Sequence, residues 1–130
     1  MPLDPEIVEL ATGRNFAALT TLFADGRPQT HIMWVDADDE HILINTEVHR
    51  AKFRKVERDP RVAVTIWDAD NPYRYAEVRG RVTEVVRGPE ARKHIDACSQ
   101  RYLGKPYPNP VTSERAILRI TPDQARARGR

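Results

Sequence analysis

Cysteine is almost absent from this 130-residue chain, in which Cys98 is the only one. A single cysteine excludes an intramolecular disulfide framework and fits a reducing cytoplasm. The sequence also lacks an apolar run that could cross a membrane, which would need about 20 residues. Its first ten residues, MPLDPEIVEL, contain neither a basic start nor an apolar core. We therefore expect a cytoplasmic protein with no signal peptide and no membrane association.

A large excess of one charge is missing as well. Lys and Arg number 21 against 19 Asp and Glu, so the net charge is +2, and the two signs are interspersed. A domain that neutralises many phosphates of a duplex usually carries a heavier basic excess, so we expect no nucleic-acid partner. The hydrophobic fraction of 40% suffices for a core, and we interpret residues 1–130 as one domain.

Residues for catalysis by the protein alone are scarce. The only serines are Ser99 and Ser113, neither of them in a nucleophile elbow, and Walker-type and GxGxxG loops are absent. Cys98 falls on an apolar helical stripe, and we interpret it as a core residue rather than a nucleophile. The histidines lack metal-ligand spacing with cysteine or acidic residues, so we expect no metal site. They are His31, His41, His49 and His94.

Short apolar, β-rich runs predict six strands. They lie at residues 16–23, 28–35, 41–46, 61–67, 74–86 and 115–121. Asp25 and Gly26 predict a hairpin, and we interpret the acidic segment 36–40 as a solvated turn. Because hairpins connect successive strands, we expect an antiparallel sheet. Six such strands predict a mainly β fold, a closed or split β-barrel that removes exposed sheet edges.

Three short helices are predicted at the periphery of the barrel, at residues 5–12, 50–58 and 89–103. Asp4 can cap the first helix, and Pro5 suits its first position. After the last strand, Thr121 and Pro122 predict the cap and first turn of a short tail.

The densest group of cations lies at the start of the second helix, in residues 45–62, NTEVHRAKFRKVERDPRV. One interpretation of Arg50, Lys52 and Arg54 is a solvated helix face. The other is a cradle for a phosphorylated small molecule. The cations gather where the helix dipole favours acidic residues and where free backbone N–H groups bind anions. Arg50 and Arg54 at i,i+4 would also repel each other without an anion between them.

Asn45 and Thr46 come just before these cations, at the end of a strand, and offer polar groups to which a ring carbonyl or ring nitrogen could dock.

The order and spacing of the motifs in this chain resemble those of the pyridoxamine-5′-phosphate-oxidase-like split β-barrel proteins. The matching pattern is DG-x-P, a strand with Trp, D-x-D, a strand ending in N-T, R-A-K-x-R and R-D-P-R-V, all between Asp25 and Val62. YAEVRGRVTEV and RAILRITPDQARA are similar to the family's long and closing strands.

The narrower resemblance is to the branch of this family that uses the deazaflavin coenzyme F420, and it implies a six-stranded antiparallel split barrel like that of the FMN-binding proteins. It also implies a homodimer with the cofactor in a groove at the subunit interface. The phosphate is expected at Arg50, Lys52 and Arg54, with His49 and Ala51 beside it. The ring or its side chain is expected to contact Thr30, His31, Ile32, Met33, Asn45 and Thr46, with Tyr73 and Tyr75 approaching from the other subunit.

The implied activity is hydride transfer from reduced F420 to an activated double bond of a small molecule, such as an enone, a quinone or a tetrapyrrole. A cofactor that carries the chemistry agrees with the scarcity of protein nucleophiles. Two alternatives stay open: an FMN-dependent oxidase or reductase of the same fold, and a non-catalytic carrier of F420 or flavin. The proton donor also stays open among a tyrosine, His31 and solvent.

Overall fold

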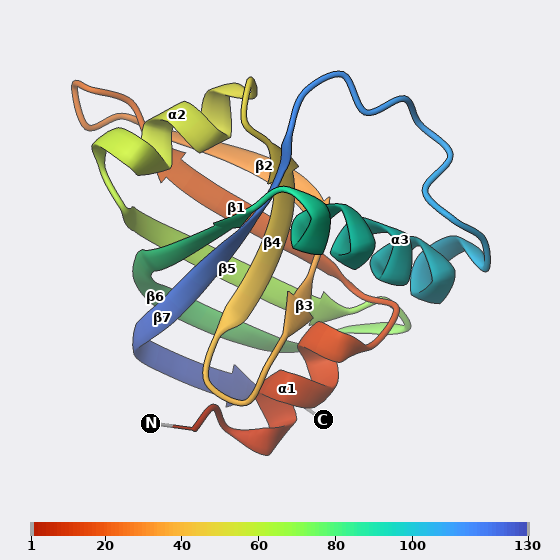
Figure 1. Cartoon of the computed structure of the whole chain (residues 1–130). Helices are drawn as coiled ribbons and strands as arrows, with labels where there is room; N and C mark the ends of the chain where they lie inside the picture. The colour runs from red at the N-terminus through yellow and green to blue at the C-terminus, as the bar shows by residue number, and fades with distance from the viewer. Residues whose placement is uncertain (1, 130) are drawn as a thin grey trace.

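A computed structural model describes residues 2–129 as a curled antiparallel sheet accompanied by three helices (Figure 1). The elements are α1 Pro5–Thr12, β1 Phe16–Leu22, β2 Pro28–Trp34, β3 Asp36–Ala37, β4 Ile42–Glu47, α2 Ala51–Arg58, β5 Arg61–Asp68, β6 Asn71–Arg87, α3 Pro89–Leu103 and β7 Arg115–Arg128. Among these residues, none of the helices combines the length and the apolar character needed to cross a membrane.

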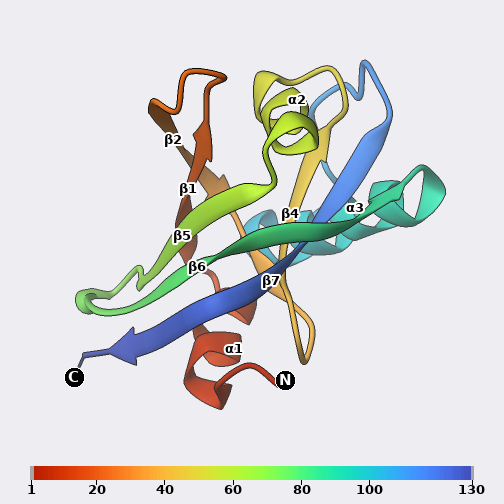
Figure 2. The same ribbon diagram turned by 90° about the vertical axis from the view of Figure 1, so that its left-hand side faces the viewer.

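The sheet curls into a barrel that does not close. Within residues 2–129 the strand order is β2-β1-β5-β6-β7-β4-β3, and every pair is antiparallel. Figure 2 shows β5, β6 and β7 side by side in the middle of this sheet. β2 forms one edge and approaches β4 without a ladder between them in the described chain. The predicted mainly β split barrel is therefore confirmed.

The predicted number of strands was wrong, because the sheet of the described residues has seven. The added strand is β3, whose Asp36 and Ala37 pair with Leu43 and Ile42 of β4. We had assigned these two residues to a solvated turn. A two-residue edge strand leaves no periodic signal in a sequence, because alternation needs at least four positions to show.

The last strand is the largest difference from the sequence-based prediction. β7 continues through Thr121 and Pro122 to Arg128, where we had expected a helical cap and turn. Pro122 lies opposite Gly80 of β6, at a register shift of the ladder. Proline cannot donate a ladder hydrogen bond, and such an irregularity accommodates it. A Cβ on Gly80 would overlap the Thr121 carbonyl oxygen, so glycine allows β6 and β7 to approach closely here.

The core fills the inside of the curled sheet. Inward-facing side chains of β1, β5 and β7 are at most 1% exposed, among them Leu19, Val64, Ile66 and Leu118. α1 and α2 lie at opposite ends of the sheet (Figures 1 and 2). The predicted cap of α1 is confirmed, because the Asp4 carboxylate accepts a hydrogen bond of 2.8 Å from the Glu6 N–H. α2 has no comparable cap, and its beginning lies beside the split of the barrel.

Candidate functional site

A pocket of about 520 Å³ lies at the split between β2 and β4. Its lining includes three cations, Arg50 and Lys52 from the start of α2 and Arg115 from the start of β7. The lining also includes apolar and aromatic side chains of β1, β2, β4, α3 and the segment before β7. They include Phe16, Ile32, Trp34, Leu43, Ile95 and Tyr107. The pocket therefore combines positive charge with a surface for a flat, apolar group.

The start of α2 has the features of an anion site. Arg50 occupies the N-cap with extended backbone, and the first turn contains no acidic residue. Within the described chain, no side chain caps the free N–H groups of this turn. They are left to water or to a ligand, and the helix dipole favours an anion there.

The charges around Lys52 point to the same conclusion. Its partial burial, followed by the positive charges of Arg50 and Arg115, lowers the pKa of Lys52 below its ordinary value. Within residues 2–129, neither Arg50 nor Lys52 forms an ion pair with a carboxylate. Cations held together without a protein anion are the arrangement that a bound phosphate would stabilise.

The structure brings together most of the site residues expected from the sequence. The pocket is lined by His31, Ile32, Met33, Asn45, Thr46, Arg50 and Lys52. It is not lined by Thr30, His49, Ala51, Arg54 or Tyr75. Tyr73 and Tyr75 line a separate depression beside Arg128.

The remaining predicted residues lie outside the pocket for identifiable reasons. Thr30 faces Thr20, with 2.8 Å between the two hydroxyl oxygens, and His49 lies 2.6 Å from the Ser113 hydroxyl. Arg54 is exposed on α2. The Arg54 N–H donates to the carbonyl of the N-cap residue Arg50 at 3.3 Å, so the two residues keep the i,i+4 backbone relation.

Asn45 lines the pocket, but the protein itself uses its amide. The side-chain nitrogen donates to the Ala91 carbonyl at 2.8 Å and lies 3.0 Å from His94 Nδ1, while the amide oxygen accepts from Arg115 Nε at 2.8 Å. A guanidinium only donates, so the oxygen must face Arg115 and the nitrogen must face His94. In the neutral ring His94 Nδ1 therefore accepts from Asn45, and the ring proton is on Nε2.

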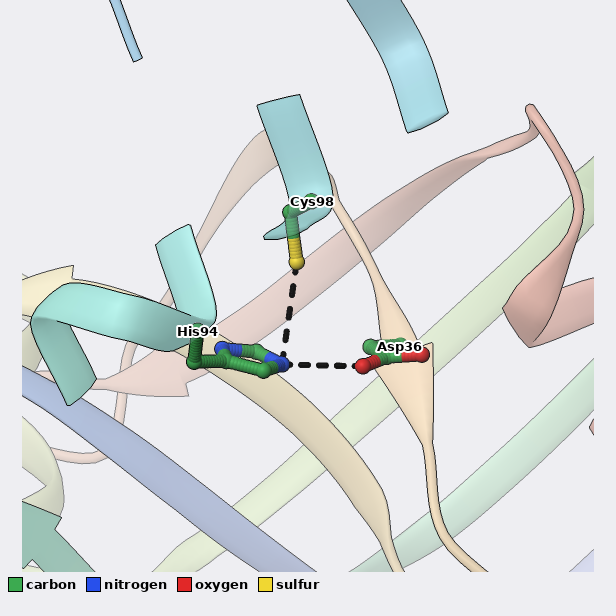
Figure 3. A group of neighbouring side chains, drawn as sticks. All are labelled: Asp36, His94 and Cys98. Atoms are coloured by element: carbon green, nitrogen blue, oxygen red, sulfur yellow. Dashed lines mark hydrogen bonds and ion pairs between the residues drawn. The ribbon is translucent and has the colours of Figure 1, made fainter. Parts of the chain in front are cut away.

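His94, Asp36 and Cys98 form a polar cluster beside the pocket (Figure 3). His94 Nε2 lies 2.9 Å from the Asp36 carboxylate and 3.6 Å from Cys98 Sγ. Burial opposes the charged form of His94, but the hydrogen bonds to Asp36 and Cys98 and the Coulombic effects of both groups together outweigh it and raise the pKa of His94 to about 9. Burial likewise disfavours the Asp36 carboxylate, but His94 and the charge of Arg101 lower the pKa of Asp36. Asp36 is thus not the solvated turn residue that we had expected.

We had also expected no metal-ligand spacing around the histidines, and this was wrong for His94. It precedes Cys98 by one helical turn, and the ligand atoms of the cluster lie within 4.8 Å of one another. A metal on Nε2 would move the ring proton to Nδ1, against the Asn45 amide hydrogens. In addition, Arg101 Nη2 lies 3.5 Å from Asp36 and 3.9 Å from Cys98. This guanidinium already supplies positive charge, so we interpret the cluster as an anchor between α3 and β3.

Arg115 lines the pocket and Glu47 holds it there, and the sequence analysis identified neither residue. They form a buried ion pair of 3.3 Å, with side chains 5% and 3% exposed. The second Glu47 oxygen accepts N–H and hydroxyl hydrogen bonds from Thr112 and Ser113 at 3.0 to 3.2 Å. Glu47 thereby fastens the segment before β7, whose Tyr107 ring lies 5.3 Å from the Arg115 guanidinium. The sequence offers only a weak signal for Glu47, namely a carboxylate at the end of an apolar strand.

Residues 3–129 match a family model described as pyridoxamine 5′-phosphate oxidase. Among solved structures, an F420 reductase is similar over 95% of this chain and 98% of its own, with 30% identity and a TM-score of 0.82. A conserved hypothetical protein from Mycobacterium tuberculosis is 26% identical over 99% of this chain and 86% of its own, with a TM-score of 0.78. General stress protein 26 from Bacillus anthracis shares the fold, with 20% identity, 95% and 91% coverage of the two chains and a TM-score of 0.67.

Proposed function

Because the chain belongs to the pyridoxamine 5′-phosphate oxidase family, we propose that it is an F420-dependent oxidoreductase that reduces a small organic acceptor. The observation that carries this proposal is the pocket, whose lining combines aromatic side chains with Arg50 and Lys52, two cations that form no ion pair within residues 2–129. The 30% identity to an F420 reductase favours F420 over FMN. When bound and reduced, this cofactor supplies a hydride for an activated double bond such as that of an enone, a quinone or a tetrapyrrole.

The residues of the chain fit such a cofactor in three ways. Arg50 and Lys52, with the free N–H groups of α2, would bind its phosphate. Phe16, Trp34 and Ile95 would cover a flat ring and exclude water, which strengthens every polar contact inside the pocket.

His31 supplies the third feature. Its Nδ1 is buried without a hydrogen-bond partner among residues 2–129. Burial, followed by the charges of Lys52 and Lys55, lowers the pKa of His31, so the ring is neutral at pH 7. A buried polar atom without a partner costs free energy, and a ligand in the pocket can supply the missing hydrogen bond. His31 is therefore a candidate to contact the cofactor or to guide a proton.

A side-by-side titration with F420 and FMN tests the proposal. We expect F420 to bind in the micromolar range or tighter, and FMN to bind more weakly. Reduced F420 should then lose its reduced-state absorbance when an enone, quinone or biliverdin is added. Binding of FMN with no binding of F420 would reject the proposal in favour of a flavin enzyme. Binding of F420 without turnover of any acceptor would favour a carrier.

We also propose that the protein acts as a homodimer. The outward face of β1, β2 and β5 carries small and apolar side chains. Cross-strand neighbours on this face are Ala18 with Ile32 and Thr65, and Thr20 with Thr30. Ile32 is 63% exposed on it and also lines the pocket, so a second copy packed here would border the cofactor.

Light scattering after size exclusion is expected to give twice the 14.9 kDa chain mass. Ala18→Arg, at the centre of this face, should shift the mass to that of the monomer. Ala97→Arg on the exposed side of α3 is the matched control and should leave the mass unchanged. A monomeric wild-type protein would contradict the proposal.

A further inference from the structure

Arg115 is held in place more firmly than the other two cations of the pocket. It begins β7 directly opposite Glu47 in the β4–β7 ladder. Its Nε donates to the Asn45 amide oxygen at 2.8 Å, and its Nη1 donates to Glu47 at 3.3 Å. Arg50 is exposed and Lys52 is half-buried, whereas Arg115 is 5% exposed. Arg115 thus loses little conformational freedom when it binds a ligand.

These contacts leave part of the guanidinium available. The group has five N–H donors, and the bonds to Asn45 and Glu47 use Nε and Nη1. Within residues 2–129, Nη2 has no hydrogen-bond partner, and the Arg115 side chain lines the pocket. A donor on a pocket-lining side chain that lacks a protein partner is a feature that a ligand can complete.

The net charge around Arg115 is close in size to the charge of a phosphate and opposite in sign. Arg50, Lys52 and Arg115 contribute three positive charges, and Glu47 contributes one negative charge, so two positive charges remain. A phosphate monoester carries about 1.5 to 2 negative charges at neutral pH. The three cations line the same pocket, and the positive charges of Arg50 and Arg115 contribute to a lowered pKa of Lys52.

We propose that Arg115 is a third anion-binding residue of the pocket and that Asn45 and Glu47 are the positioning residues that aim it. This inference rests on the proposed function only in taking the anion to be the cofactor phosphate. It changes the role of Asn45, which we had expected to contact the ring. The amide oxygen of Asn45 instead accepts from Arg115, and its amide nitrogen donates to the Ala91 carbonyl of α3.

A comparison of FMN with riboflavin isolates the phosphate, because the two differ by that group alone. Arg115→Gln should weaken FMN binding by about 10- to 100-fold, the range for a hydrogen bond to a charged group, and should change riboflavin binding less than about twofold. Asn45→Ala should weaken FMN binding by about 3- to 10-fold, again without an effect on riboflavin. Arg54→Gln removes the same charge outside the pocket and should leave both affinities within about twofold.

The control for folding is Arg115→Lys, which keeps the partner of Glu47 but loses the fork of donors. It should fold and still bind FMN less tightly than wild type. Equal losses for FMN and riboflavin, in this variant or in Arg115→Gln, would overturn the inference. So would equal FMN losses in Arg54→Gln and Arg115→Gln.

Inorganic pyrophosphate separates this inference from the proposed function. If the wild type binds neither F420 nor FMN, the proposed function fails. In that case, and also if the wild type binds F420 but not FMN, the anion site is judged by thermal unfolding in the presence of pyrophosphate. A pyrophosphate-dependent rise in Tm for wild type and Arg54→Gln, but not for Arg115→Gln, would support Arg115 as an anion ligand. No rise in the wild-type protein would overturn it.

Discussion

Replacement of Glu47 by glutamine is expected to lower the free energy of unfolding by about 3 to 5 kcal/mol. The substitution leaves Arg115 as a buried charge without its counter-ion. It also breaks hydrogen bonds, because both Glu47 oxygens accept: one from Arg115, the other from Thr112 and Ser113. The NH₂ group of a glutamine must face one of these sets of donors. Urea denaturation at pH 7 measures the loss.

The pH dependence of the unfolding free energy provides a second measurement of the contribution of Glu47. Burial alone would disfavour its charge, but hydrogen bonds from Ser113 and Thr112 and the charge of Arg115 lower the pKa of Glu47. The folded-state pKa lies below the unfolded value, so the unfolded chain binds more protons at acidic pH. The contribution of Glu47 is therefore present above the unfolded pKa, about 4.3, and is lost as the pH falls through the folded pKa. Glu47→Gln should flatten this acidic limb of the stability curve.

Glu57→Gln is the matched control, because Glu57 is exposed on α2. It should change the unfolding free energy by less than about 0.5 kcal/mol. If Glu47→Gln proves as mild as Glu57→Gln, the Glu47–Arg115 pair does not hold the segment before β7, and Arg115 loses its positioning partner.

The sequence predicted the fold well wherever a pattern was local. Apolar, β-rich runs on either side of Asp25 and Gly26 located β1 and β2, and Asp4 with Pro5 located the start of α1. Prediction failed where a neighbour distant in sequence decides the conformation. Thr121 and Pro122 carry a helix-capping signal, yet pairing with Gly80 keeps β7 extended.

The same contrast between local patterns and distant contacts applies to the residues of the site. Arg50 and Lys52 could be found because a short helix that starts with cations and lacks an acidic cap is unusual by itself. Arg115 could not, because its partners Asn45 and Glu47 lie about seventy residues earlier and meet it only through the β4–β7 ladder. The pocket of this split barrel lies at the gap, where strands that are distant in sequence face each other. Spacing along the chain therefore indicates candidate cations for an anion site, but it does not predict the contacts that orient a residue such as Arg115.

Removal of both helix-start cations should have the largest effect on ligand binding. Arg50→Ala with Lys52→Ala is expected to weaken F420 binding by about a hundred- to ten-thousand-fold. Each charged hydrogen bond accounts for roughly 1.5 to 3 kcal/mol. The lower end applies if the two cations share one phosphate, because neighbouring contacts are not additive. Lys52→Ala alone should cost one to two orders of magnitude on the same scale.

Arg54→Ala with Arg58→Ala is the matched control, since it removes the same charge from exposed positions of α2 outside the pocket. Fluorescence titration with F420 at two salt concentrations measures both pairs. A direct phosphate contact predicts a large loss for the first pair at either salt concentration, and at most a small, salt-sensitive loss for the second. Equal losses in the two pairs would mean that α2 attracts anions only through its general field. The phosphate would then have to bind elsewhere than at the start of this helix.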